Sequence, residues 1–209
     1  MSQQTLSTIV PKLALLAAIA LSNPGCTAKT EDTEAPPPAP PAQALATPLF
    51  LDAALNGDAN TVQTALLGGT DVNGTDDMKR TALMLASFNG HLPVVKILVD
   101  AGAEVDARDS MGRSPLMFAS TGPNSETVAL LLQHGAEVNA TDGDEHWSPL
   151  MFAAAEGHAA VVKTLLQHDA NPNLEDIDGE TALDFALQRE QEQAANLLRA
   201  VAKPGEAIP

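Results

Sequence analysis

The chain has 209 residues, which is enough for one moderate domain with appended segments. Apolar residues make up 44% of it but aromatic residues only 3%, a balance that favours closely packed helices over a large globular core. The formal net charge of −16 argues against nucleic acids and anionic lipid surfaces as partners, because their phosphates would repel the chain.

Residues 1–25 have the pattern of a secretory signal peptide. Lys12 and the α-amino group supply positive charge, and an uncharged apolar run of nine residues extends from Leu13 to Leu21. A helix of that length rises only about 14 Å, roughly half the thickness of the hydrocarbon layer, so the run is too short to span a membrane. We therefore expect an exported protein.

The residues around Cys26 resemble the cleavage site of a bacterial lipoprotein. Gly25 matches the small residue of that site, whereas Asn23 and Pro24 depart from its pattern. The resemblance implies that Cys26 becomes the lipidated first residue of the mature chain, and that Thr27, in place of Asp, directs it to the outer membrane. Ordinary signal-peptidase cleavage, which would release a soluble periplasmic protein, is the alternative.

Residues 26–47 are predicted to be a flexible tether between this cysteine and the folded domain. Their composition is dominated by Ala, Pro, Thr and Glu, and proline at this density favours an extended polyproline II conformation. At ~3.1 Å per residue, the tether could hold the domain up to ~65 Å from its anchor. A Pro-rich ligand for SH3-type domains is the alternative, although an exported protein would not meet such domains.

A pattern of about 33 residues recurs through residues 48–202. The copies start 33, 34 and 33 residues apart, at Thr81, Ser114, Ser148 and Thr181. The first of them reads TALMLASFNGHLPVVKILVDAGAEVDARD, and residues 49–76 carry the second half of the same pattern. These segments resemble the ankyrin repeat at nearly every signature position. The resemblance implies an all-α solenoid of five helix-turn-helix repeats with projecting β-turn fingers, in which the first and last repeats cap the stack.

Helix signals agree with this resemblance. The four starting residues are Ser or Thr, which are preferred N-caps, and Pro115 and Pro149 occupy the first helical position. Gly90 is expected to break a first helix, and Gly102 and Gly135 to end second helices in the left-handed conformation.

Four departures from the repeat pattern predict local differences. Pro123 replaces the glycine of the third repeat, so the turn between its helices should differ. Lys79 replaces a finger glycine, and Asp169 replaces a helix-ending glycine at a cost of about 1 kcal/mol. One extra residue lengthens the finger that begins at Asp142. Residues 203–209 are expected to form a disordered tail.

Ankyrin domains bind partners through their finger tips and the inner face of their first helices, and the resemblance implies the same here. Framework positions repeat the family pattern, so the variable positions would carry specificity. In the fingers these positions are Asp77, Met78, Arg80, Ser110, Met111, Arg113, Asp144, Glu145, His146, Trp147, Ile177, Asp178 and Glu180. On the first helices, the partner-binding candidates are Phe88, Asn89 and Glu156.

Bulky apolar side chains recur in the fingers, at Met78, Met111, Trp147 and Ile177. The hydrophobic effect does not explain an apolar residue on a solvated tip unless that residue packs or meets a partner. Trp147 is the only Trp and lies in the lengthened finger, which makes it the leading candidate for a binding hot spot. The alternative is that these side chains pack on the adjacent finger.

Charge is graded along the fingers. Residues 71–80 and 104–113 hold six acids and four bases, whereas residues 137–147 and 171–180 hold eight acids and no base. This gradient favours a partner with a basic surface toward the C-terminal fingers. The alternative is that the acidity only keeps the protein soluble. Four of the acids are expected to brace the finger turns: Asp76, Asp109, Asp142 and Asp176.

Metal binding and catalysis are not indicated. Met84, Met117 and Met151 recur at one repeat position, which could suggest copper, but this position packs between repeats. His134 and His168 would lie about 8–10 Å apart on stacked helices, too far for one metal ion. No nucleophile elbow, zinc-protease motif or phosphate-binding glycine loop occurs in the chain. We therefore expect no enzyme activity, no cofactor and no metal.

The sequence as a whole predicts a monomeric, protein-binding module tethered in the bacterial cell envelope. It would act as an adaptor or an inhibitor of a periplasmic protein. Two alternatives stay open: an immunity-type protein that masks a toxin or effector, and a structural spacer without a dedicated partner.

Overall fold

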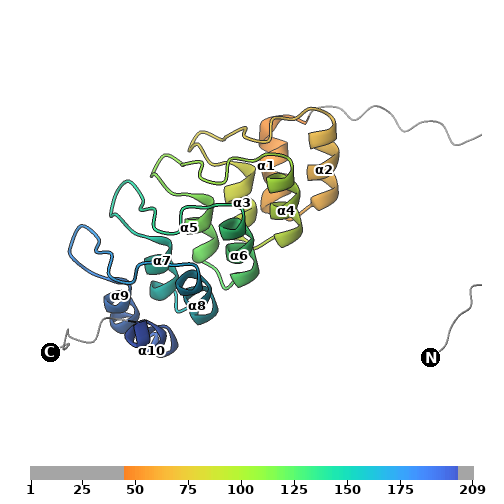
Figure 1. Cartoon of the computed structure of the whole chain (residues 1–209). Helices are drawn as coiled ribbons and strands as arrows, with labels where there is room; N and C mark the ends of the chain where they lie inside the picture. The colour runs from red at the N-terminus through yellow and green to blue at the C-terminus, as the bar shows by residue number, and fades with distance from the viewer. Residues whose placement is uncertain (1–44, 202–209) are drawn as a thin grey trace, which may run out of the picture. The chain divides into compact units, whose positions relative to one another are not determined.

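Ten helices form five helix-turn-helix repeats in the computed structural model, which describes residues 45–201 (Figure 1). The first helices of the repeats are α1 (Thr47–Leu55), α3 (Ala82–Phe88), α5 (Pro115–Ser120), α7 (Pro149–Ala155) and α9 (Ala182–Gln188). The second helices are α2 (Ala59–Leu67), α4 (Leu92–Asp100), α6 (Ser125–Gln133), α8 (Ala159–Gln167) and α10 (Glu192–Val201). The predicted all-α repeat solenoid is therefore confirmed.

The leader, the lipidation candidate Cys26, the tether up to residue 44 and the tail lie outside the described residues. Within residues 45–201, none of the helices is long and apolar enough to cross a membrane.

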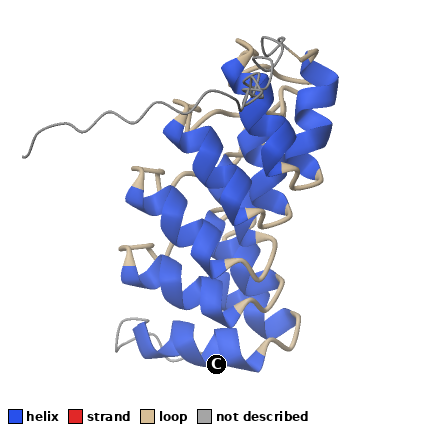
Figure 2. Cartoon of the chain, turned by 90° about the vertical axis from the view of Figure 1, so that its right-hand side faces the viewer, coloured by secondary structure: helices blue, strands red, loops and turns tan. Residues whose placement is uncertain are grey.

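The helices form two layers, in which each helix packs on its counterpart in the next repeat. The odd-numbered helices stack from α1 to α9, and the even-numbered helices stack from α2 to α10. Figure 1 shows the loops that precede α3, α5, α7 and α9 projecting from that layer as fingers, and Figure 2 shows the helices stacked side by side along the domain. We call the side formed by the odd-numbered helices and the fingers the inner face.

Local side-chain caps start the first helices α3, α5, α7 and α9. The hydroxyl of Thr81 accepts the Met84 N–H at 3.3 Å, and the Met84 sulfur accepts the Thr81 N–H at 3.5 Å. Ser114 with Met117 and Ser148 with Met151 repeat both contacts. All three methionines are buried, so the packing interpretation of this column is confirmed. In the last repeat, the Asp184 carboxylate replaces the sulfur and accepts the Thr181 N–H at 2.8 Å.

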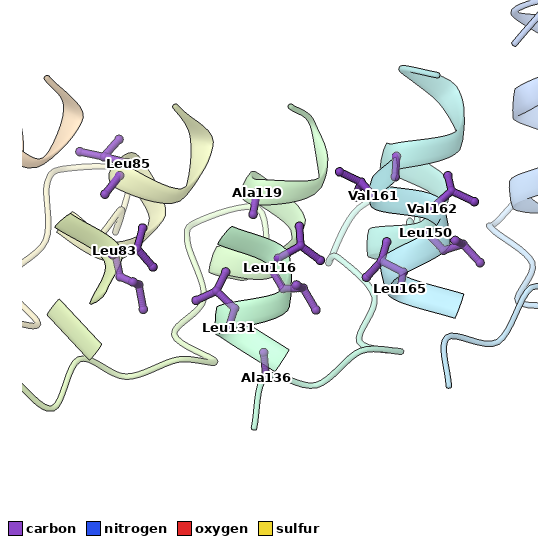
Figure 3. Close-up of a cluster of buried hydrophobic side chains, with 14 of the residues drawn as sticks. Leu83, Leu85, Leu116, Ala119, Leu131, Ala136, Leu150, Val161, Val162 and Leu165 are labelled. Atoms are coloured by element: carbon purple, nitrogen blue, oxygen red, sulfur yellow. The ribbon is translucent and has the colours of Figure 1, made fainter. Parts of the chain in front are cut away.

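The core fills the space between the two layers. Leu116 and Leu150 of the odd-numbered helices are buried with Leu131, Val162 and Leu165 of the even-numbered helices (Figure 3). Each such side chain contributes about 1.5–3 kcal/mol by leaving water. Every first helix is short and rich in small residues, so neighbouring repeats approach closely and bury one another's apolar faces.

Left-handed residues close the turns as predicted. Gly102 and Gly135 follow second helices with φ of 87°, and Asp169 takes the same role with φ of 63°. Lys79 adopts φ of 58° in the first of the four long fingers. The turn that contains Pro123 differs, because none of residues 121–124 has a positive φ, whereas Gly90 has φ of 67° at the corresponding turn.

The ends of the described stack are not equivalent. The Leu45 N–H donates to the Thr70 hydroxyl at 2.7 Å, so residues 45–47, which their composition places in the tether, belong to the fold. The first repeat leaves Leu49 and Leu67 exposed. The outer surface of α10 is polar and carries Gln193 among other exposed residues.

Candidate protein-binding surface on the fingers and inner face

One aspartate braces each of the four long fingers. The Asp76 carboxylate accepts the Met78 N–H at 2.9 Å and the Arg80 N–H at 2.8 Å. Asp109, Asp142 and Asp176 hold their fingers through equivalent hydrogen bonds. The framework role predicted for these four acids is confirmed.

Backbone hydrogen bonds join each finger to the next. The Ser110 N–H donates to the Met78 carbonyl at 2.9 Å, and the Gly143 N–H donates to the Met111 carbonyl at 2.8 Å. Ile177 completes the series by donating to the Glu145 carbonyl at 3.2 Å. The tips therefore form one continuous ridge rather than four independent loops.

The residue before each first-helix N-cap sets the charge of its finger. Arg80 lies 2.7 Å from the Asp76 carboxylate, and Arg113 makes the equivalent ion pair with Asp109 at 2.7 Å. At the same position the next two fingers carry Trp147 and Glu180. The bracing aspartate is therefore neutralised by an arginine in the first two long fingers but not in the last two.

The Arg80 pair also affects the ionisation of Asp76. Partial burial of the Asp76 carboxyl opposes its ionisation, but hydrogen bonds from the Arg80 backbone and side chain and from the Met78 N–H outweigh this effect. With the added attraction of the Arg80 charge, the pKa of Asp76 lies below its usual value.

Trp147 does not project from the ridge. Its side chain is partly buried, and its ring centroid lies 5.1 Å from that of Phe152 and 4.3 Å from that of Phe185. Packing, the alternative to a projecting side chain, is therefore observed for Trp147, although its contacts are with Phe152 and Phe185. His146 has φ of 58° and occupies the left-handed position that Lys79, Gly112 and Gly179 take in the other long fingers. A role of Trp147 in binding stays a prediction.

Three other apolar finger residues are exposed as the sequence predicts. Met78 is 43% exposed, Met111 37% and Ile177 54%. Because neighbouring fingers are bonded to each other, these side chains share one ridge. The polar candidates Asp77, Ser110, Asp144, Glu145, His146 and Asp178 are also exposed.

The candidates on the first helices face differing surroundings. Phe88 is 48% exposed and meets the ring of Phe118 edge-on, with centroids 6.3 Å apart. The Asn89 amide donates to the Leu55 carbonyl at 2.7 Å and links the first two repeats. Glu156 forms an ion pair with Arg189 at 3.2 Å. Phe88 is thus the least constrained of these candidates.

A small pocket lies on the inner face beside Phe88. Its volume is about 50 Å³. Its lining residues come from α3, α5 and α7 and from the finger before α5: Phe88, Arg113, Met117, Phe118, Thr121 and Phe152. The guanidinium of Arg113 lies 4.7 Å from the centre of the Phe118 ring. Sequence reasoning missed this pocket, although the recurrence of phenylalanine at residues 118 and 152 was a signal for it.

Two family models of ankyrin repeats match the sequence, one over residues 50–142 and the other over residues 131–186. The chain belongs to the ankyrin-repeat family. No curated protein matches it. Ankyrin repeats typically serve as non-enzymatic modules for protein–protein interaction, so the ridge and inner face of this ankyrin domain are the surface on which a protein partner is expected.

The histidines of the ankyrin domain are structural where the pattern predicts it. The Nε2 atom of His91 lies 3.0 Å from the Leu55 carbonyl, and that of His158 lies 3.0 Å from the Thr121 carbonyl. Each histidine therefore ties its repeat to the preceding one. Within residues 45–201, no three His, Cys, Asp or Glu side chains gather in a way that could hold a metal ion.

Proposed function

We propose that this ankyrin domain binds a protein of the bacterial cell envelope through its ridge and inner face, and acts as an adaptor or an inhibitor of that protein. The supporting observation is the gathering of exposed apolar side chains on one surface. Met78 and Met111 lie on adjacent fingers, Ile177 lies two fingers further along the same hydrogen-bonded ridge, and Phe88 lies on the first helix that follows the Met78 finger. Exposed apolar residues grouped in this way gain free energy by meeting a partner.

The charge of the ridge supports a partner with a basic face toward the C-terminal fingers. The bracing acids of the first two long fingers are paired with Arg80 and Arg113. The corresponding finger positions further along carry Trp147 and Glu180, so negative charge is uncompensated there. Complementary charge would speed encounter with a basic protein and disfavour acidic ones.

The proposal places the domain at a membrane through a lipid on Cys26. The support is the sequence alone: an apolar leader, the small residue Gly25 and a Pro-rich segment up to the fold. One acyl chain binds membranes only weakly, so two or three would be needed for durable anchoring. The anchored protein would be a monomer on the periplasmic side of the outer membrane.

Site-specific photo-crosslinking in intact cells tests the binding surface. A photoreactive amino acid is placed at Met78, Met111 or Ile177 on the ridge and, as the matched control, at Leu67 or Lys163, which are exposed on the even-numbered helices. We expect the ridge positions to yield one common protein adduct that the control positions lack. A partner captured equally from both layers, or no ridge adduct at all, contradicts the proposal and favours a structural spacer. An adduct with a toxin or effector would identify the immunity-type role.

Metabolic labelling with radioactive palmitate tests the anchor. We expect the full chain to be labelled and to fractionate with the outer membrane, and the Cys26→Ser chain to be unlabelled. Labelling that persists in the Cys26→Ser chain would place the lipid on another residue, and an unlabelled full chain would show no lipidation; either result contradicts the proposed anchor.

A further inference from the structure

We infer that the partner inserts one branched aliphatic side chain into the pocket between Phe88, Phe118 and Phe152, and carries lysine or arginine on the side toward the C-terminal fingers. The inference rests on the proposed function and adds the chemistry of the bound segment to it.

The size of the pocket selects the anchoring side chain. The pocket measures about 50 Å³, room for about four groups the size of a water molecule at about 10–15 Å³ each. A leucine or isoleucine side chain has four carbon atoms of that size, whereas an aromatic ring has at least six. The size of the pocket therefore favours an aliphatic anchor over an aromatic ring.

The walls of the pocket are apolar, and part of this apolar surface is open to solvent. Met117 and Phe118 are buried, Phe152 is partly buried, and the ring of Phe88 is 48% exposed at the rim. An aliphatic group seated here would remove the exposed face of Phe88 from water as well as its own surface. Apolar burial stabilises by roughly 25 cal/mol for each Å² removed from water, so both surfaces contribute to binding.

Arg113 excludes a basic side chain from the pocket itself. Its guanidinium is held by the Asp109 carboxylate at 2.7 Å and lies over the Phe118 ring at 4.7 Å from the centroid. A lysine or arginine of the partner would leave water for apolar walls whose only charged lining residue is itself a cation. The basic residues of the partner are therefore expected outside the pocket.

The acidic finger that leads into α7 supplies the complementary charge. Phe152 lies in α7, and the finger that leads directly into α7 carries the exposed residues Asp144 and Glu145. The next finger adds the exposed residue Asp178. A basic group next to the aliphatic anchor would face these carboxylates.

Charge also decides against the other possible occupants. The tether of this chain carries Glu31, Asp32 and Glu34 against the single base Lys29. A second copy of the chain carries the same formal charge of −16. Both would be repelled by the acidic fingers, so the occupant is a different, basic protein segment.

Selection of phage-displayed random twelve-residue peptides on the immobilised full chain tests the inference. We expect the enriched peptides to combine a leucine or isoleucine with neighbouring lysine or arginine, and their binding to weaken as salt is raised. Enriched peptides that lack the aliphatic residue or the bases overturn the inference.

Variants of the chain show where the selected peptide binds. Fluorescence anisotropy measures the dissociation constant of the peptide for each variant. Phe88→Ser removes the exposed rim, and Thr121→Met fills the pocket from its wall. We expect each to weaken binding by about tenfold or more, because an aliphatic side chain gains about 1.5–3 kcal/mol on burial. Leu67→Ser, which removes an apolar residue of α2 that is 78% exposed, should change binding less than about twofold.

Charge reversal tests the orientation. Asp144→Lys combined with Glu145→Lys should weaken binding, whereas Asp100→Lys combined with Glu126→Lys, both exposed on even-numbered helices, should weaken it much less. Equal effects of the two pairs overturn the proposed orientation. Peptide binding that appears only after residues 34–42 are deleted would show that the tether occupies the pocket. A dimer that dissociates in the Phe88→Ser variant would show that a second copy of the chain occupies it. Either result overturns the inference.

The outcomes separate this inference from the proposed function. A ridge-crosslinked envelope protein without a basic aliphatic segment contradicts the inference alone. A full chain that yields no ridge crosslink in cells contradicts the proposed function, whatever peptides it selects.

Discussion

The indole of Trp147 lies on the ring of Phe185 from the next repeat, with centroids 4.3 Å apart and planes inclined by 48°. The contact joins the lengthened finger to α9 and bridges two repeats. A repeat protein is stabilised mainly by such contacts between neighbours, so the only tryptophan of the chain is part of the stacking interface.

Replacing Trp147 should therefore lower stability. Because its side chain is partly buried, we expect Trp147→Ala to reduce the free energy of unfolding by about 2–3 kcal/mol, and Trp147→Phe to reduce it by less than about 1.5 kcal/mol. Urea unfolding followed by far-UV circular dichroism measures both. Ile177→Ala is the control, because Ile177 is 54% exposed and its loss should cost less than about 0.5 kcal/mol. If Trp147→Ala and Ile177→Ala cost the same, the packing seen for Trp147 does not stabilise the domain.

The fold could be predicted from the sequence because each signal for a helix start, a helix end or a buried face recurs in several repeats. The N-cap hydroxyls, the helix-ending glycines and the apolar faces of the second helices all indicate the same geometry. Lys79 and Asp169 were identified as left-handed positions because glycine occupies them in other repeats.

The binding surface was less predictable, because it depends on how side chains lie. The sequence identifies Trp147 as a finger residue, but it does not indicate that the indole packs on Phe152 and Phe185. The sequence pattern predicts that Arg80 and Arg113 are available to a partner at the finger tips. In the structure each forms an ion pair with the aspartate that braces its own finger. The pocket was missed although phenylalanine recurs at residues 118 and 152, because its walls come from three separate helices and one finger. Residues that recur in every repeat therefore predict the framework of the fold. The contacts of residues that differ between repeats can be seen only in the three-dimensional structure.

Two non-glycine residues in left-handed conformation offer sites for stabilisation. Lys79 has φ of 58° and Asp169 has φ of 63°. The left-handed conformation disfavours residues with a Cβ by about 1 kcal/mol, so Lys79→Gly and Asp169→Gly should each raise the melting temperature. Asp169 also follows the C-terminal end of α8, where a negative charge is unfavourable, so its replacement should help more. Gly135→Ala is the reverse test, because it adds a Cβ at φ of 87° with nothing within 4 Å of it. It should lower the free energy of unfolding by about 1 kcal/mol. A stabilising Gly135→Ala would contradict the backbone explanation.

The Asp76 ion pair should make stability depend on pH in the acid range. The pKa of Asp76 is lower in the folded state than its ordinary value, so its contribution is complete above about pH 4 and is lost as pH falls through the folded pKa. Asp76→Asn retains an oxygen for the Met78 and Arg80 N–H groups but removes the charge. We expect the melting temperature of this variant to fall less than that of the wild type between pH 5 and pH 3. Asp77→Asn, at the exposed neighbouring position, should keep the wild-type slope, and identical slopes in all three proteins would count against the prediction.

Two buried hydroxyls lack hydrogen-bond partners within the described residues, those of Ser87 and Thr127. An unpaired buried hydroxyl costs about 1–3 kcal/mol, so Ser87→Ala and Thr127→Val should each raise the free energy of unfolding. Ser120 lies at the same repeat position as Ser87, but its hydroxyl donates to the Leu116 carbonyl at 2.7 Å. Ser120→Ala should therefore give no comparable gain. Equal effects at Ser87 and Ser120 would show that the missing partner does not matter.

Gly112 and Gly179 occupy the same repeat position in two fingers. Alanine substitutions at these two glycines distinguish the cost of backbone strain from the cost of a clash between fingers. Gly112 has φ of 75° and Gly179 has φ of 83°, so alanine at either position incurs the left-handed penalty of about 1 kcal/mol. A Cβ at Gly112 would also lie 2.6 Å from the Gly143 nitrogen, which donates to the Met111 carbonyl in the bond that joins two fingers, whereas a Cβ at Gly179 meets nothing within 4 Å.

We expect Gly112→Ala to lower the free energy of unfolding by at least about 1 kcal/mol more than Gly179→Ala, because backbone must move to relieve the clash. Hydrogen exchange of the Gly143 amide should also become faster in Gly112→Ala and stay unchanged in Gly179→Ala. Equal unfolding energies with an unchanged Gly143 amide would mean that the fingers move independently, and the continuous ridge on which partner binding is proposed would then be wrong.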